Sequence, residues 1–326
     1  MISLRPVLLI LLALLSLPSA HASPYSAVVV FGDSLSDNGN VLTATTTGGG
    51  TPFPTAPYYN GRRSDGPVAV EYLANALGAP LLDYAYMGAT TGAGLNGDGG
   101  NVATQAILPG MTTAYNTVKG SLTAPLLAGG LFVVWGGPND LLAPAPADIG
   151  NPTAIITRAV GNLVGIISDL QVRGARSILV PGMSDLGLAP AFLAQGDVAA
   201  GLASDFTDAF NIALRQALLL LPRPTEAIYF DTADLMRKVA ANPAAYGFTN
   251  ATGVCYGGIG PTACANPGDY AYFDSLHPST EAHALIAQGF LQAVPEPSSP
   301  VLLGVGLLVL AGARRQALAR ASRGNP

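Results

Sequence analysis

The chain has 326 residues, of which 49% are hydrophobic and 11% are charged, and 20 acidic against 15 basic residues give a formal net charge of −5. Soluble domains carry about 25% charged residues on average, so this composition excludes disorder driven by charge. The lysines are Lys119 and Lys238, and no basic run interrupts the interior of the chain. We therefore exclude nucleic acid as a partner.

Residues 1–22 have the three parts of a secretory signal peptide. Arg5 precedes an uncharged apolar stretch over residues 7–17, and Ala20-His21-Ala22 forms a small-residue cleavage site. The alternative, a membrane-spanning anchor, needs about 20 apolar residues and is disfavoured by the shorter stretch. We predict that the mature chain begins at Ser23.

Residues 23–294 carry no linker or internal repeat, and we predict one domain there. Short β-branched apolar runs predict buried strands, and longer segments with apolar residues at helical spacing predict helices between them. The strands are predicted at residues 27–31, 131–135, 177–180 and 227–230. The helices are predicted at residues 67–77, 153–173, 205–221 and 280–292, the first with Pro67 at its entry and the last capped by Ser279. This alternation predicts an α/β fold, with a mainly parallel sheet between two layers of helices.

Two glycine-rich stretches, residues 43–66 and 88–130, have no clear helix or strand pattern. They are long for connections in a compact domain, so we expect functional loops over the sheet.

The mature chain contains two histidines, which limits the choice of a general base. His277 follows Asp274 by three residues, a spacing that allows the carboxylate to accept the Nδ1 proton and leaves Nε2 free as a base. His283 falls inside the predicted last helix, where a packing or capping role is favoured. Ser34, directly after the first strand, is the candidate nucleophile, because ligands bind at the carboxyl ends of strands in open α/β sheets.

Cys255 and Cys264 lie in a stretch rich in glycine, proline and asparagine. In an exported chain this favours a disulfide that closes a short surface loop. Metal binding is the weaker alternative, because two cysteines without nearby histidines do not complete a zinc site. Gly92-Ala93-Gly94-Leu95-Asn96-Gly97 matches the G-x-G-x-x-G spacing of a dinucleotide-binding loop, but it precedes more loop rather than a helix, and no acidic residue follows about 20 positions later. We therefore predict no nucleotide, no metal and no other cofactor.

Residues 295–326 form a C-terminal segment in three parts. Pro295-Glu296-Pro297 precedes an uncharged apolar run over residues 301–313 and a final group of arginines. As a helix the run spans about 20 Å, short of a roughly 30 Å hydrocarbon core. The segment resembles the PEP-CTERM sorting signal of Gram-negative bacteria, which implies transient membrane contact, processing by an exosortase and export to the periplasm, the outer surface or the extracellular matrix. An ordinary weak anchor is the alternative.

Four ordered blocks resemble those of the GDSL, or SGNH, hydrolases. They are Gly32-Asp33-Ser34-Leu35, residues 83–91, Gly136-Gly137-Pro138-Asn139-Asp140 and Asp274-x-x-His277-Pro278. Residues 57–67, with Glu71-Tyr72-Leu73, resemble the plant-type branch and its bacterial relatives. The resemblance implies the flavodoxin-like SGNH fold, a Ser34-His277-Asp274 triad, and an oxyanion hole made by Ser34, Gly88 and Asn139. Pro138 departs from the block, where a small polar residue is usual.

These residues lead to the expectation of an exported serine esterase or lipase. Its substrates would be lipid, small acyl esters or acylated glycan. Three alternatives stay open: an exopolysaccharide O-deacetylase, an acyltransferase using the same acyl-enzyme, and a noncatalytic surface-binding module.

Overall fold

A computed structural model of the chain describes residues 23–47, 49–94, 108–222 and 226–295. The predicted signal peptide at residues 1–22 lies outside the described residues, and so does the predicted C-terminal segment from residue 296 onward.

Five parallel strands form the central sheet in the order β2-β1-β3-β4-β5. They are β1 (Val28–Gly32), β2 (Leu81–Asp83), β3 (Leu131–Trp135), β4 (Ser177–Pro181) and β5 (Glu226–Phe230). The four predicted strands are confirmed to within one residue at each end. The sequence does not predict β2, because three residues are too few to form a recognisable run.

The strands bury both faces of the sheet. Val28 and Val30 of β1 face one layer of helices, whereas Val29 and Phe31 face the other, as expected from the alternation of side chains along a strand. All four side chains are fully buried. A parallel sheet covered on both sides requires such continuous apolar strands.

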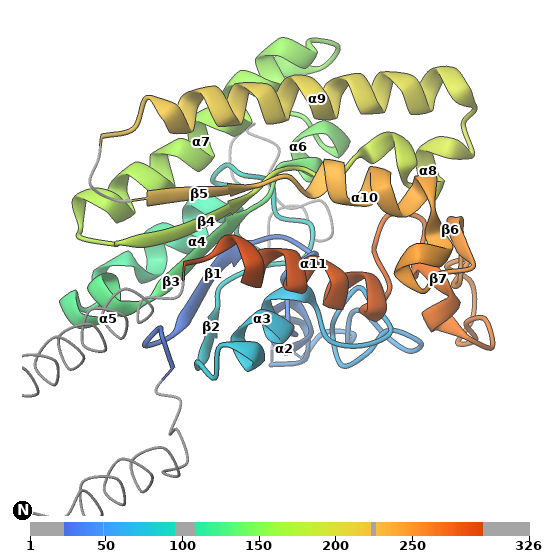
Figure 1. Ribbon diagram of the computed structural model, residues 1–326, viewed down its shortest axis with the longest axis horizontal. Coiled ribbons are helices and arrows are strands. Elements are labelled where there is room, and N and C mark those ends of the chain that lie inside the picture. The colour runs from blue at the N-terminus through green and yellow to red at the C-terminus, as the bar shows by residue number, and fades with distance from the viewer. Residues whose placement is uncertain (1–22, 48, 95–107, 223–225, 296–326) are drawn as a thin grey trace, which may run out of the picture.

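Helices cover the sheet on both sides and produce the three layers visible in Figure 1. One layer contains α3 (Ala69–Ala76), α10 (Thr232–Ala241) and α11 (Thr280–Ala293). The other contains α4 (Met111–Val118), α5 (Ala124–Gly129), α7 (Pro152–Val172) and α9 (Asp197–Leu219). Further helices are α2 (Asn40–Thr47), α6 (Pro138–Leu142) and α8 (Pro190–Leu193). The predicted α/β/α sandwich is confirmed, and its strand order is that of flavodoxin-like folds.

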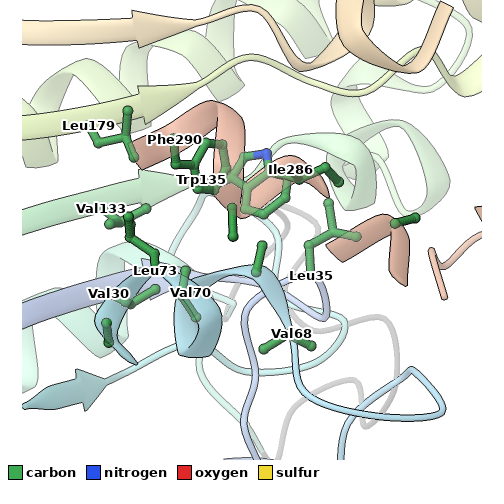
Figure 2. Packing of buried hydrophobic residues seen from close by; sticks show 14 of the residues in the cluster. Val30, Leu35, Val68, Val70, Leu73, Val133, Trp135, Leu179, Ile286 and Phe290 are labelled. Atoms are coloured by element: carbon green, nitrogen blue, oxygen red, sulfur yellow. The ribbon is translucent and has the colours of Figure 1, made fainter. Parts of the chain in front are cut away.

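Trp135, the last residue of β3, lies at the centre of the core between the sheet and α11 (Figure 2). Its ring meets Phe290 of α11 edge-on, with centroids 5.3 Å apart, and its Nε1 donates to the Gly182 carbonyl at 3.2 Å. Phe290 also meets Phe230 of β5 edge-on at 5.1 Å. These contacts fix the last helix against the ends of β3 and β5.

Two helix starts differ from the prediction. α9 begins at Asp197 rather than residue 205, because its first two turns expose Val198 and Leu202 and bury small alanines, which leaves no apolar stripe to recognise. α3 begins at Ala69, so Pro67 precedes the helix instead of occupying its first position. The ends of α7 and α11 agree with the prediction to within one residue.

The two glycine-rich stretches, predicted as loops, contain helices. Residues 88–130 include α4 and α5, and residues 43–66 begin with the end of α2. Sequence patterns miss α4 because its threonines and asparagine have low helix propensity. Residues 49–66 remain a loop without regular structure.

A small two-stranded parallel sheet lies beside the main one. It pairs β6 (Asn250–Val254) with β7 (Tyr270–Tyr272). The predicted disulfide between Cys255 and Cys264 closes the connection directly after β6, with an S–S distance of 2.06 Å. Its position places a covalent link close to the segment that carries His277.

Helix α7 is long and apolar enough to cross a membrane, and it is the one such helix among the described residues. It lies in the layer that covers one face of the sheet, and residues such as Leu163 and Ile167 on its inner face are buried there. We therefore assign α7 to the core of the domain.

Candidate active site

Ser34 lies in a tight turn at the carboxyl end of β1. The Asp33 carbonyl accepts hydrogen bonds from the backbone N–H groups of Ser36 and Asp37, and the Asp33 side chain accepts one from Leu35. Gly32 is required just before the turn, because a Cβ atom there would lie 2.8 Å from the Trp135 carbonyl oxygen. The turn thus holds the serine at the edge of the sheet between β1 and β3, where the strand order reverses and ligands bind in such folds.

Asp274 and His277 lie in a short turn between β7 and α11. Asp274 Oδ1 accepts backbone N–H bonds from Leu276 at 2.9 Å and from His277 at 2.8 Å. The turn ends at Ser279, whose hydroxyl accepts a hydrogen bond from Ala282 and caps α11 as predicted. The turn therefore fixes the backbone of both residues relative to the last helix.

The structure brings Ser34, His277 and Asp274 into one chain of hydrogen bonds. His277 Nε2 lies 2.9 Å from Ser34 Oγ, although the two residues are 243 positions apart in the sequence. His277 Nδ1 lies 2.8 Å from Asp274 Oδ1 and 2.9 Å from Asp274 Oδ2. Both Ser34 and Asp274 are buried, and this order of contacts can move a proton from the serine hydroxyl to the imidazole.

Two further residues that the sequence analysis does not identify also bind Asp274. Tyr58 Oη donates to Asp274 Oδ2 at 2.7 Å, and Arg63 Nη2 lies 3.0 Å from the same oxygen. Burial by itself would raise the pKa of Asp274, yet the pKa lies well below its usual range because His277, Arg63 and Tyr58 stabilise the carboxylate. Asp274 is therefore ionised at neutral pH.

Gly88 and Asn139 line the same cavity as Ser34 and His277. Asn139 belongs to α6 at the end of β3, and its Nδ2 donates to the Ala89 carbonyl at 2.9 Å. Gly137 directly precedes this helix with a φ of +130°, and a Cβ there would meet the Phe210 ring at 2.6 Å. Pro138 occupies the first helical position, where a backbone N–H is not needed, which explains the departure from the usual block.

The cavity above Ser34 has a volume of about 240 Å³. Most of the side chains in its wall are apolar, and Phe53 and Leu142 are also exposed at the surface. The apolar lining consists of Leu35, Phe53, Met87, Pro138, Leu142, Leu186, Ala189, Met236, Tyr272, Leu276 and Pro278. Such a cavity can take an apolar chain next to the serine hydroxyl.

Acidic side chains around the site accept hydrogen bonds from backbone N–H groups. Asp37 accepts hydrogen bonds from Gly39, Asn40 and Met87, and Asp140 accepts two from Thr91. Asp33 is almost fully buried, and burial together with the nearby Asp140 raises its pKa to about 7. These contacts join the turns that carry Ser34, Gly88 and Asn139.

His283 lies apart from Ser34, as the sequence analysis expects. Its Nδ1 accepts a hydrogen bond from the Ala69 N–H at 3.3 Å, so it caps the start of α3. Burial, with a smaller effect of His277, lowers the pKa of His283 to about 3. The ring is therefore neutral and structural.

Among the described residues, no group of three or more His, Cys, Asp or Glu side chains is arranged to hold a metal ion. The cysteines form the disulfide described above rather than a metal site.

A parallel sheet with a serine hydrogen-bonded to a histidine at its carboxyl edge defines a hydrolase with an α/β fold. Residues 28–290 match the family model of the GDSL-like lipase/acylhydrolases, and residues 293–316 match that of the PEP-CTERM protein-sorting motif. The chain belongs to the GDSL-like lipase/acylhydrolase family. It is an enzyme that hydrolyses ester bonds, and its sorting motif indicates export in a Gram-negative bacterium.

Relatives of the chain come from bacteria and plants. Esterase EstA of Pseudomonas aeruginosa is 30% identical over 334 residues, which cover 90% of this chain and 50% of EstA. Acetylajmalan esterase 2 of Rauvolfia serpentina is 28% identical over 328 residues, and the alignment covers 81% of this chain and 89% of the esterase. Phosphatidylcholine-sterol acyltransferase of Aeromonas hydrophila is 30% identical and covers 77% of this chain and 72% of its own. The chain thus spans half the length of EstA.

Among solved structures, the acetylxylan esterase Axe2 of Geobacillus stearothermophilus is similar with a TM-score of 0.41 and 12% identity. The alignment covers 84% of this chain and 97% of Axe2.

Proposed function

We propose that the chain is an exported serine esterase that cleaves carboxylic esters through an acyl-enzyme on Ser34. His277 Nε2 takes the hydroxyl proton while Ser34 Oγ attacks the acyl carbonyl carbon. Asp274 accepts a hydrogen bond from the Nδ1–H group, stays ionised and stabilises the imidazolium that forms. The imidazolium then gives its proton to the leaving alkoxide, and the acyl group stays esterified to Ser34.

A water molecule completes the cycle. His277 takes a proton from the water as its oxygen attacks the acyl carbonyl, and the imidazolium returns that proton to Ser34 Oγ when the carboxylic acid leaves. One ester and one water thus give one acid and one alcohol, with the enzyme restored.

The negative oxygen of each tetrahedral intermediate needs donors aimed at it. We assign this role to the backbone N–H groups of Ser34 and Gly88 and to the side-chain amide of Asn139. The positions of Gly88 and Asn139 in the wall of the same cavity support this assignment.

The observation that carries the proposal is the 2.9 Å contact between Ser34 Oγ and His277 Nε2. A serine that only caps a turn requires no contact with a histidine 243 positions away, whereas a nucleophile requires a base within hydrogen-bond reach.

The apolar lining of the cavity indicates how long an acyl group the enzyme prefers. A chain of several methylene groups would bury apolar surface against side chains such as Leu186 and Met236, at about 0.8 kcal/mol per methylene group. An acetyl group would leave most of this surface without a partner. We therefore propose acyl esters longer than acetate as the preferred substrates.

We propose that both terminal segments of the chain act in export. Residues 1–22 would direct export and be removed before Ser23, and residues 295–326 would be processed by an exosortase-type enzyme after transient contact with the membrane. The match to the sorting motif supports this route. So does the disulfide, because disulfides form and persist in oxidising compartments.

Hydrolysis of aryl esters with graded acyl length tests the proposal. We expect turnover by the full chain to rise from acetate to longer acyl groups, and Ser34→Ala and His277→Ala each to lose roughly 10⁶-fold in kcat. His283→Asn is the matched control, because its amide oxygen can replace Nδ1 as the acceptor for Ala69, and it should keep most of the activity.

Equal losses at His277 and His283 would refute the assignment of the base. Exclusive release of acetate from acetylated glycan would indicate a deacetylase instead. A chain that hydrolyses no ester and transfers no acyl group would be a noncatalytic surface module.

A further inference from the structure

Two side chains of the loop of residues 49–66 bind the Oδ2 atom of Asp274. Tyr58 Oη lies 2.7 Å and Arg63 Nη2 lies 3.0 Å from Oδ2, on the side of the carboxylate away from its backbone partners. Oδ1 is bound by two backbone N–H groups of the turn, and both oxygens lie within 2.9 Å of His277 Nδ1. The carboxylate is thus held from two separate elements.

Tyr58 and Arg63 also hold each other in place. The Arg63 guanidinium lies over the Tyr58 ring, 4.4 Å from its centroid, in a cation–π contact. The Tyr58 ring meets Tyr256 edge-on at 5.3 Å and Phe273 at 5.5 Å. Tyr256 follows directly after Cys255 of the disulfide, so the pair packs against a segment that is covalently linked to Cys264.

The chemistry of the two side chains suits a buried carboxylate. Burial and the neighbouring Asp274 raise the pKa of Tyr58, so the phenol stays protonated and donates its hydrogen bond. The Arg63 guanidinium offsets part of the negative charge of Asp274. Without Arg63, more of the negative charge of Asp274 would act on the His277 ring.

We propose that Tyr58 and Arg63 are positioning residues, which aim Asp274 at His277 Nδ1 and limit how strongly Asp274 stabilises the protonated imidazole. The proposal rests on the function proposed above. Its consequence is that Arg63 keeps His277 available as a base at lower pH.

The other groups around His277 do not replace Arg63. Asp33 and Asp185 lie in the wall of the cavity, and His283 interacts with His277 from within α11. Burial keeps Asp33 largely protonated at acidic pH, and Asp185 is paired with Arg237 at 2.6 Å, so Asp274 is the carboxylate that favours a protonated imidazole. Arg63 is the cation in the described part of this wall. Removal of Arg63 should therefore have an effect with a defined sign.

The same loop offers a matched pair of controls. Arg62 is bound to Glu71, with Nε 3.1 Å from Oε2, and it lies 5.7 Å from the centroid of the Tyr59 ring. Tyr59 is exposed. Tyr59 and Arg62 thus repeat the residue types of Tyr58 and Arg63 at adjacent positions and are paired away from Asp274.

The experiment measures kcat and KM of the full chain on p-nitrophenyl butanoate across pH. We expect Arg63→Gln and Tyr58→Phe to lose about 10- to 100-fold in kcat with KM unchanged, because a misplaced catalytic group can cost about 10²-fold. The acid limb of the profile should move to higher pH in Arg63→Gln and stay in place in Arg63→Lys, which keeps the charge. Arg62→Gln and Tyr59→Phe should match the unmodified chain.

A rise in KM without a loss of kcat in Arg63→Gln, or an acid limb that does not move, would overturn the proposal. Thermal unfolding of each variant separates these effects from loss of the fold, and Tyr58→Phe and Arg63→Lys continue the test if Arg63→Gln does not fold. The NMR titration of the His277 ring, assigned by its absence in His277→Ala, does not depend on turnover. A midpoint at higher pH in Arg63→Gln than in Arg62→Gln supports the proposal even if no ester is hydrolysed, and equal midpoints contradict it.

Discussion

The side-chain amide of Asn139 has two N–H donors. One donates to the Ala89 carbonyl at 2.9 Å and ties α6 to the turn that carries Gly88. We propose that the other serves an oxyanion in the cavity that Asn139 lines. Asn139 thus joins two of the sequence blocks around Ser34. Its hydrogen bond to the Ala89 carbonyl also fixes the orientation of the whole amide group.

Asn139→Ala should reduce kcat by about 10²–10³, because the developing oxyanion loses a fixed donor, and it should leave KM nearly unchanged. Steady-state kinetics on a short aryl ester measures both constants. Asn75→Ala, on the exposed side of α3, serves as the control. A loss below tenfold at Asn139 would exclude its amide from the oxyanion hole.

At the residue scale, a catalytic side chain can be predicted from the sequence when its residue type is rare in the chain. After residue 22 the sequence has two histidines, which limit the base to His277 or His283, and a carboxylate three positions away favours His277. Tyr58 and Arg63 escape this reasoning because their residue types are common and Asp274 is more than two hundred positions away. The available signal was the resemblance of residues 57–67 to one branch of the family, which carried no role for either residue.

The β6–β7 element depends on a covalent link. Cys255 and Cys264 are separated by nine positions, and the bond lies beside the buried aromatic cluster of Tyr256 and Phe273. A disulfide across a loop of this length stabilises mainly by restricting the unfolded chain.

Replacing both cysteines by serine should lower the free energy of unfolding by about 2–3 kcal/mol. Urea unfolding of the oxidised chain, the reduced chain and the double variant measures the change. The reduced chain and the variant should agree with each other, and both should unfold at lower urea than the oxidised chain. Coincident curves for all three would show that the link adds no stability.

At the element scale, apolar runs and caps predict most of what positions the site. The strands β1 and β3 and the capped start of α11 follow from residues 27–31, 131–135 and Ser279. Helices α4 and α5 do not follow, because tertiary packing rather than propensity stabilises them. The early start of α9 also does not follow, since its first turns pack with alanines.

At the scale of the whole molecule, strand order decides which residues meet. β1 and β3 are neighbours in the sheet, which brings the turns of Ser34 and Asn139 together, and α11 packs on α3 and sets the preceding turn above them. The sequence predicts a parallel sheet but does not give the order of its strands. The resemblance to a family, rather than periodicity, supplied the expectation that these distant blocks form one site.

His283 links α11 to the start of α3 and makes the stability of the domain depend on pH. The folded chain keeps the ring neutral, with a pKa of about 3, whereas the unfolded ring has a pKa near 6.5. Below pH 6.5 the unfolded chain therefore binds one more proton at this residue, and stability falls on acidification by up to about 1.4 kcal/mol per pH unit.

His283→Asn should therefore lose less stability than the unmodified chain between pH 6.5 and about 5. Urea unfolding at several pH values measures the difference, and the comparison cancels the contributions of Asp33 and other groups common to both proteins. Parallel pH dependences would mean that His283 is not held neutral in the fold.

Fluorophosphonate labelling followed by peptide mapping is the most direct test of the central claim, that His277 activates Ser34 as the nucleophile. The full chain should be modified at Ser34, Ser34→Ala should take up no label, and His277→Ala should react far more slowly than His283→Asn. A label on another residue, or equal rates in the two histidine variants, would contradict the account.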